Sequence, residues 1–195
     1  KGDIAIEHQV KEILEELEFL QERFFSRWTA EIVRLADRVA NTFRNEGRLF
    51  VFGTGASGNV AQILAGNLTH RVAVSRPPLP AVALNTDGPL LGAIAERDSA
   101  DEIFSRQLEA LARKGDMALA FSPDGESPAA LRALVYAREH DLVTAAFLGR
   151  DGGRIKNYTD LALVVEAESP ARVHEVHLIA AQILAQLVER QIFSL

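Results

Sequence analysis

The sequence predicts an α/β protein built on a parallel sheet of five strands, with helices on both faces and a helical extension at the N-terminus. Two observations predict this class. From residue 48 onward, short and almost wholly apolar segments alternate with longer helical ones, as is typical of a parallel sheet covered on both sides. Before them lies a long stretch with helical periodicity and no strand-like segment.

The apolar segments that we expect to form strands span residues 48–53, 81–85, 117–121, 142–148 and 161–166. The helices expected in this part of the chain cover residues 58–68, about 100–113, 128–140 and 171–193. Ligands of parallel sheets bind beyond the carboxyl ends of the strands. The loops that follow the first and third strands are therefore the places where we expect a site.

The N-terminal region is predicted to be helical over residues 4–45. Its apolar residues recur at three- and four-residue steps, beginning with Ile6, Val10, Ile13, Leu14, Leu17 and Leu20. Ser26 is a candidate cap for a second helix, and Gly47 is expected to end the region in the left-handed conformation. One small sheet cannot cover this stripe, so we expect part of it to pack against another copy of the chain.

Length and composition indicate one globular domain with an extension. We divide the 195 residues into a helical region, 1–47, with a role in oligomerisation, and an α/β domain, 48–195. The net charge of −6 and the scattered lysines and arginines argue against direct binding of nucleic acid. The absence of cysteine excludes disulfides and thiolate chemistry and fits a cytoplasmic protein. No apolar run has the length of a membrane span, so we expect no membrane association.

The first loop, Gly53–Gly58, follows the first predicted strand and has the sequence Gly-Thr-Gly-Ala-Ser-Gly. Small residues at this place leave backbone N–H groups free to hold an anion at the positive end of the next helix. Gly53, Gly55 and Ser57 are the candidate binding residues, with Ser57 as the hydroxyl donor. The alternative is a tight turn that lets the helix pack closely on its strand.

The second loop, Ser122–Ser127, follows the third predicted strand and carries two carboxylates, Asp124 and Glu126. Ser122, Asp124 and Ser127 are the candidate binding residues. A carboxylate about 4 Å from a phosphate costs on the order of 4 kcal/mol at an intermediate dielectric, so Asp124 opposes phosphate binding. Asp124 would be favourable if it accepted hydrogen bonds from sugar hydroxyls. Asp124 and Ser127 are also candidate N-caps of the helix that begins near Pro128.

The last helix carries His174 and His177, three residues apart and therefore on one face. A metal site would need a further ligand from elsewhere, and nothing nearby in the sequence supplies one. We favour a pair of histidines at a helix–helix contact over a metal site.

Four further segments are distinctive, and they lie in order along nearly the whole chain at Arg76–Asp87, Ile103–Asp116, Leu148–Gly153 and Ala171–His177. Together they resemble the sugar isomerase (SIS) domain family, and most closely its phosphoheptose isomerase group and a relative that associates with the DnaA initiator. It implies a flavodoxin-like sheet, a homotetramer and phosphosugar ligands bound between subunits. It also implies that Ser57, Ser122 and Ser127 retain serines of the phosphate-binding loops.

The chain departs from the resemblance where the chemistry is expected. The catalytic Glu and His of phosphoheptose isomerases correspond to Asn67 and Gln182, and His174 stands where the family has Gln. Two positions of the family's zinc site hold Ile63 and Asn67, so we expect no metal and no cofactor.

Isomerisation of an aldose to a ketose needs a base and an acid. The titratable side chains that remain nearby are the weak catalytic candidates His174, Glu175, His177 and Asp87. The first hypothesis is therefore a phosphosugar-binding protein that resembles phosphoheptose isomerase but has altered acid and base positions. The alternative is a non-catalytic regulatory or scaffold protein of the initiator-associating type. Its apolar end, Gln191–Leu195, offers a patch for a protein partner or for packing within the oligomer.

Overall fold

The computed structural model describes residues 2–193 and contains one parallel sheet of five strands. The strands lie in the order β2-β1-β3-β4-β5. Their bounds are Leu49–Gly53 for β1, Ala81–Ala83 for β2, Met117–Ser122 for β3, Val143–Gly149 for β4 and Leu161–Val165 for β5. This is the flavodoxin-like order that the resemblance implies. The predicted fold class is therefore confirmed, although β2 is two residues shorter than expected.

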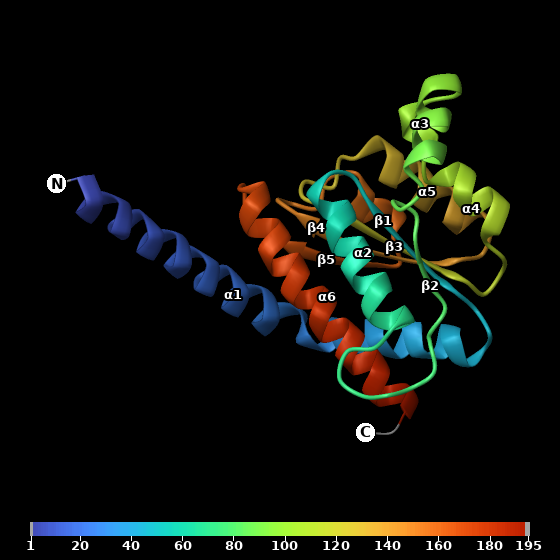
Figure 1. The fold of residues 1–195 in the computed structure, drawn as a ribbon, viewed down its shortest axis with the longest axis horizontal. Coiled ribbons are helices and arrows are strands. Elements are labelled where there is room, and N and C mark those ends of the chain that lie inside the picture. Colours follow the sequence, from blue (N-terminus) through green and yellow to red (C-terminus); the bar gives the residue numbers. More distant parts are fainter. Residues whose placement is uncertain (1, 194–195) are drawn as a thin grey trace.

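Helices cover both faces of the sheet (Figure 1). On one face lie α1 (Gly2–Arg44), α2 (Ala56–Thr69) and α6 (Pro170–Phe193), and α6 packs against both of the others. The other face carries α4 (Ser105–Leu111) and α5 (Pro128–Glu139), with α3 (Gly88–Arg97) beside them. Two short 3₁₀ helices, Ala100–Glu102 and Ile155–Tyr158, complete the chain.

The two faces of the sheet have separate apolar cores because successive strand residues point to opposite sides. Val51, Leu119 and Phe147 pack under α1, α2 and α6. Phe52, Ala120 and Leu148 pack under α4 and α5. Burial on both faces explains why the strands are almost wholly apolar in sequence.

The N-terminal region is one continuous helix, so the second helix considered at Ser26 does not exist. Its second half is buried against α6 and the sheet, whereas its first half projects beyond the body of the molecule (Figure 1). Large side chains of the projecting half are exposed, among them Ile6, Val10, Leu14 and Phe19. The first half of the stripe predicted from the sequence is therefore exposed in the monomer, whereas Leu17 and Leu20 at its end pack against the core.

The left-handed residue after α1 is Glu46, with a φ of 61°, and not Gly47 as expected. Gly47 is required for a different reason. A Cβ at this position would lie 2.6 Å from the carbonyl oxygen of Gly115. Close approach of two backbone segments therefore explains this glycine.

The sequence missed α3, and the expected helix over 100–113 is a 3₁₀ turn followed by the short α4. The local signal for α3 was present, because Asp87 caps its N-terminus and Pro89 occupies its first turn. Ile94 is the one buried residue of this helix. The apolar residues Leu90, Leu91 and Ile94 span little more than one turn, which is too short a run to identify a helix by its periodicity.

The two loops predicted to form a site lie side by side at the carboxyl edge of the sheet. The neighbouring strands β1 and β3 are in register, with Gly53 opposite Phe121. The strand order reverses between β1 and β3, and such switch points are where open α/β sheets bind ligands.

Within residues 2–193, no helix combines the length and the apolar character needed to cross a lipid bilayer.

Candidate functional site

The first loop leads directly into α2, and its conformation leaves this helix end open. Gly55 has a φ of 58°, and no side chain of residues 2–193 caps α2 at this end. Thr54, Gly55 and Ala56 are exposed. An uncapped helix N-terminus presents free N–H groups and a positive partial charge to solvent, so the first loop is suited to an anion.

Close packing requires the first glycine of this loop. A Cβ on Gly53 would lie 2.7 Å from the carbonyl oxygen of Phe121 and 2.8 Å from the Cβ of Ser57. The tight turn that we considered as the alternative therefore exists. It coexists with the open helix end, so the two interpretations do not exclude each other.

The second loop differs because its own side chains already take up its donors. Asp124 Oδ1 accepts hydrogen bonds from the Glu126 N–H at 2.9 Å and from the Ser122 hydroxyl at 3.2 Å. Ser122 Oγ accepts from the Gly125 N–H at 3.1 Å, and Ser127 Oγ caps α5 through the Ala130 N–H at 3.4 Å. An internal carboxylate thus lies where the second loop would otherwise offer N–H groups to an anion.

The other carboxylate of the second loop is also occupied. Glu126 accepts from the backbone N–H of Arg154 at 2.9 Å and forms an ion pair with its guanidinium at 2.6 Å. The turn before Arg154 packs tightly on the loop, because a Cβ on Gly125 would lie 2.0 Å from the carbonyl oxygen of Gly152. Glu126 therefore holds the loop to this turn instead of facing a ligand alone.

Residue His174 joins α6 to the first loop. Its Nε2 lies 3.1 Å from the hydroxyl oxygen of Ser57, which is fully buried in the first turn of α2. The imidazole is half-buried, and burial lowers the pKa of His174 because it penalises the charged form. The structure thus brings together two of the predicted site residues.

The second histidine, His177, belongs to the core. It is fully buried beside Phe121 and Phe147, and its Nε2 donates a hydrogen bond to the carbonyl of Leu148 at 3.1 Å. Burial lowers the pKa of His177 to about 3, although the bond to Leu148 partly opposes this shift. His177 therefore packs α6 against the sheet and not against another helix as expected, whereas His174 contacts Ser57 of α2.

The remaining catalytic candidates serve local structure. The Asp87 carboxylate caps α3 by accepting from the Leu90 N–H at 3.0 Å. Glu175 forms an ion pair with Arg172 at 2.6 Å, one turn earlier on α6. Neither contact brings a free acid or base to the first loop.

The two positions at which the resemblance places the acid and base are in direct contact. Asn67 Nδ2 on α2 donates a hydrogen bond to Gln182 Oε1 on α6, at 2.7 Å. Each is half-buried. Carboxamides do not ionise near neutral pH, so this pair cannot exchange protons as a carboxylate and an imidazole do.

Sequence reasoning missed the buried ion pair that supports this contact. Arg76 donates from Nη2 to the Asn67 carbonyl at 2.9 Å and from Nη1 to the Leu68 carbonyl at 2.8 Å. Its Nε lies 2.7 Å from Glu189 of α6. The motif Arg76–Asp87 pointed to the arginine, but no sequence spacing linked it to Glu189, 113 residues away.

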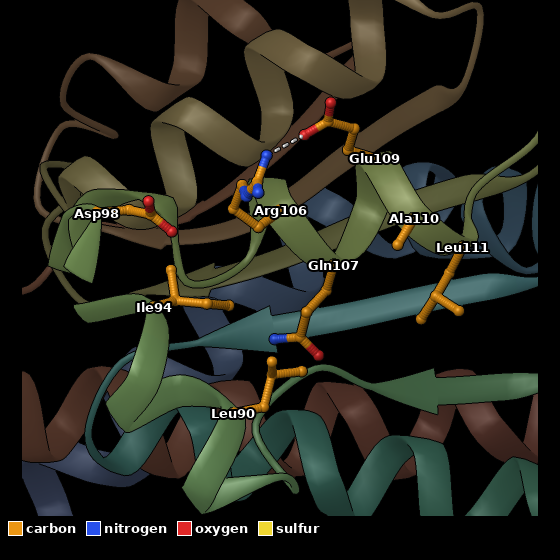
Figure 2. Close-up of a pocket in the computed structure, with 8 residues that line it drawn as sticks. All are labelled: Leu90, Ile94, Asp98, Arg106, Gln107, Glu109, Ala110 and Leu111. Atoms are coloured by element: carbon orange, nitrogen blue, oxygen red, sulfur yellow. Dashed lines mark hydrogen bonds and ion pairs between the residues drawn. The ribbon is translucent and has the colours of Figure 1, made fainter. Parts of the chain in front are cut away.

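A cavity of about 510 Å³ lies away from these loops, between α3 and α4. Figure 2 shows that its wall is formed by the residues Leu90, Ile94, Asp98, Arg106, Gln107, Glu109, Ala110 and Leu111. Arg106 is paired with Glu109 at 3.0 Å, and the Gln107 amide donates to the carbonyls of Leu84 and Ile103. Arg106, Glu109 and Gln107 are thus engaged with the protein, and we assign no chemistry to this cavity.

Comparison with known proteins agrees with the class that the sheet order and the paired loops define. The SIS domain family matches residues 12–149. The phosphoheptose isomerase of Trichlorobacter lovleyi is 39% identical over 167 residues, which cover 86% of this chain and 85% of that protein.

Solved structures agree with this match. A phosphoheptose isomerase from Francisella tularensis has a TM-score of 0.90 at 25% identity, covering 94% of this chain and 97% of that one. The enzyme from Neisseria gonorrhoeae has a TM-score of 0.89 at 28% identity, covering 94% and 98%. The chain therefore belongs to the SIS domain family, and within it to the proteins that resemble phosphoheptose isomerase.

Proposed function

We propose that this protein binds a phosphosugar at the first loop but does not isomerise it with the acid and base of phosphoheptose isomerases. The observation that carries the proposal is the hydrogen bond between Asn67 and Gln182. The family fold and the open end of α2 support the binding half of the proposal. The amide pair supports the loss of catalysis.

The expected loss is large. General acid–base catalysis contributes typically about 10²–10⁴-fold for each group. The hydrogen bond also ties the two amides to each other, and a carboxamide is not a base that could accept a proton from a sugar carbon. We therefore expect little or no conversion of sedoheptulose 7-phosphate.

We further propose that the protein is a homo-oligomer, as the family resemblance implies, and that a tetramer is its form. The projecting half of α1 supports this, because monomers rarely leave so regular an apolar stripe in water. The exposed residues Ile6, Val10 and Ile13 follow the four- and three-residue steps of a helix–helix seam. The same steps continue to Leu17 and Leu20, which pack against the core of the protein itself.

Two measurements test the proposed function. Titration calorimetry with sedoheptulose 7-phosphate is expected to show binding, while an isomerisation assay of the same preparation shows no turnover above the uncatalysed rate. The paired substitution Asn67→Glu with Gln182→His is then assayed for gained turnover. Robust turnover by the unchanged protein would refute the loss of catalysis. Absence of binding would refute the phosphosugar site and favour the scaffold alternative.

A further inference from the structure

The contact between His174 and Ser57 determines which of them can donate a proton to a ligand. A serine hydroxyl has one hydrogen, and the distance of 3.1 Å between Ser57 Oγ and His174 Nε2 means that one of these atoms donates to the other. When Nε2 carries no hydrogen, Ser57 donates to it. When Nε2 carries a hydrogen, His174 donates, and the hydroxyl hydrogen of Ser57 is free.

A neutral His174 permits the first arrangement. Its imidazole is half-buried, and burial lowers its pKa, so the ring is neutral at neutral pH. A neutral ring can accept from Ser57 with Nε2, which leaves the hydroxyl of Ser57 without a hydrogen for any other partner.

The carboxylates around His174 are paired with other groups, so none of them stabilises a protonated imidazole in the free protein. On α6, Arg172 and Glu175 are paired with each other at 2.6 Å, and His177 remains neutral because its pKa is about 3. Glu16 of α1 lies 3.9 Å from Arg172. In the second loop, the Asp124 carboxylate accepts hydrogen bonds from the Ser122 hydroxyl and the Glu126 N–H.

An anion at the first loop changes this balance. A phosphate at the open end of α2 needs donors, and Ser57 stands in the first turn of that helix. The phosphate's negative charge also favours a positive charge on a nearby imidazole. Both effects act in the same direction, toward a hydrogen on Nε2.

We propose that binding of a phosphate monoester at the first loop is coupled to protonation of His174. In the bound state His174 donates a hydrogen bond to Ser57, and Ser57 donates one to the phosphate. This inference rests on the proposed phosphosugar site and adds to it a residue at which the chain departs from the family resemblance, His174. His174 acts on the ligand through Ser57 and is therefore a positioning residue.

The coupling of binding to proton uptake determines how the affinity for the phosphate monoester changes with pH. Binding that takes up a proton is stronger at low pH and weakens as pH rises through the pKa of the bound state. Each unit by which bound His174 exceeds free His174 in pKa makes the limiting affinity at low pH about tenfold higher than that at high pH.

The test compares the unchanged protein with His174→Gln, which keeps a polar side chain but cannot titrate. Titration calorimetry with sedoheptulose 7-phosphate at pH 7, in two buffers of different ionisation enthalpy, gives the protons taken up on binding. The phosphate's own ionisation contributes equally to both proteins, so the difference between them isolates His174. His140→Gln, at an exposed position on the far side of the sheet, is the matched control.

The outcomes separate this inference from the proposed function. We expect the unchanged protein and the His140 variant to take up more protons than His174→Gln. Equal uptake by all three would overturn the inference and leave the phosphosugar site in place. If none of the three binds, the proposed function fails and the inference with it.

If His174→Gln alone fails to bind, ¹⁵N NMR of the imidazole in the unchanged protein decides. A pKa of His174 that rises when sedoheptulose 7-phosphate is added supports the inference. An unchanged pKa, or a hydrogen that moves from Nδ1 to Nε2 without proton uptake, overturns it.

Discussion

Replacing Glu189 with Gln is expected to destabilise the protein far more than a change of one atom suggests. The side chains of Glu189 and Arg76 are 2% and 1% exposed, so their ion pair is closed to solvent. Glu189 also accepts hydrogen bonds from the backbone N–H groups of Ala73, at 3.1 Å, and Val72, at 3.5 Å. Glu189→Gln leaves the guanidinium of Arg76 buried without a counter-charge.

Breaking a buried pair by removing one partner typically costs about 3–5 kcal/mol. For a chain of this size, 1 kcal/mol corresponds to roughly 2–4 °C in Tm, so we expect a decrease of about 6–20 °C. The assay is thermal and urea unfolding at one fixed protomer concentration, because association would add to the apparent stability.

The control is Glu109→Gln, which removes the same charge from an arginine pair on the surface. Arg106 and Glu109 are 51% and 58% exposed, and pairs of this kind contribute about 0–1 kcal/mol. A loss of 1 kcal/mol or less in the Glu189 variant, equal to that of the control, would refute the reasoning. It would mean that Arg76 reaches water or another partner when Glu189 is neutral.

Three further predictions concern the loops, the core and α1. Asp124→Ser should tighten phosphosugar binding by about 1–2 kcal/mol, because it removes a negative charge and frees the Glu126 N–H; weaker binding in calorimetry would show that Asp124 contacts the ligand favourably. His177 stays neutral in the fold down to pH about 3 but titrates near 6.5 when unfolded, so stability is lost as pH falls below 6.5, by about 2 kcal/mol at pH 5. In urea unfolding, His177→Gln should flatten that dependence, and an unchanged slope would contradict the assignment. Light scattering should show an assembly that Leu14→Glu weakens, whereas a monomeric unchanged protein would remove the proposed role of α1.

The sequence was sufficient for most of the sheet because β1, β3 and β4 are buried on both faces. An apolar run such as Met117–Phe121 is typical of a strand covered on both faces. The alternation of such runs with helices predicted the parallel α/β fold class. The sequence was insufficient for α3, which buries Ile94 alone, and for the residue that turns the chain after α1. A glycine just after a helix usually adopts the left-handed conformation, which is why Gly47 was expected to do so. The structure instead requires a glycine at this position because its backbone lies close to Gly115.

The candidate site was predictable as a place but not as a set of contacts. The position of the first and second loops follows from their places after β1 and β3. The contact of Ser57 with His174 joins residues that are 117 positions apart. Local sequence patterns do not predict it, because it forms only when α2 packs against α6 in the folded protein. The sequence also did not determine which way the Asp124 side chain points, since a carboxylate in a loop can face a ligand or its own backbone. The roles of the six proposed binding residues, the assembly and the cytoplasmic location stay predictions.

The departures from the family resemblance have a common electrostatic consequence. In the second loop, Asp124 places a negative charge among N–H groups that could otherwise hold a phosphate. At the positions where the resemblance implies an acid and a base, Asn67 and Gln182 are amides, which cannot carry a charge. Attraction for an anion is therefore concentrated at the open end of α2, where His174 is the one titratable side chain that the described structure places in contact with the first loop. The proposed binding would therefore gain affinity through a proton on His174, and it would not require proton transfer to or from the sugar.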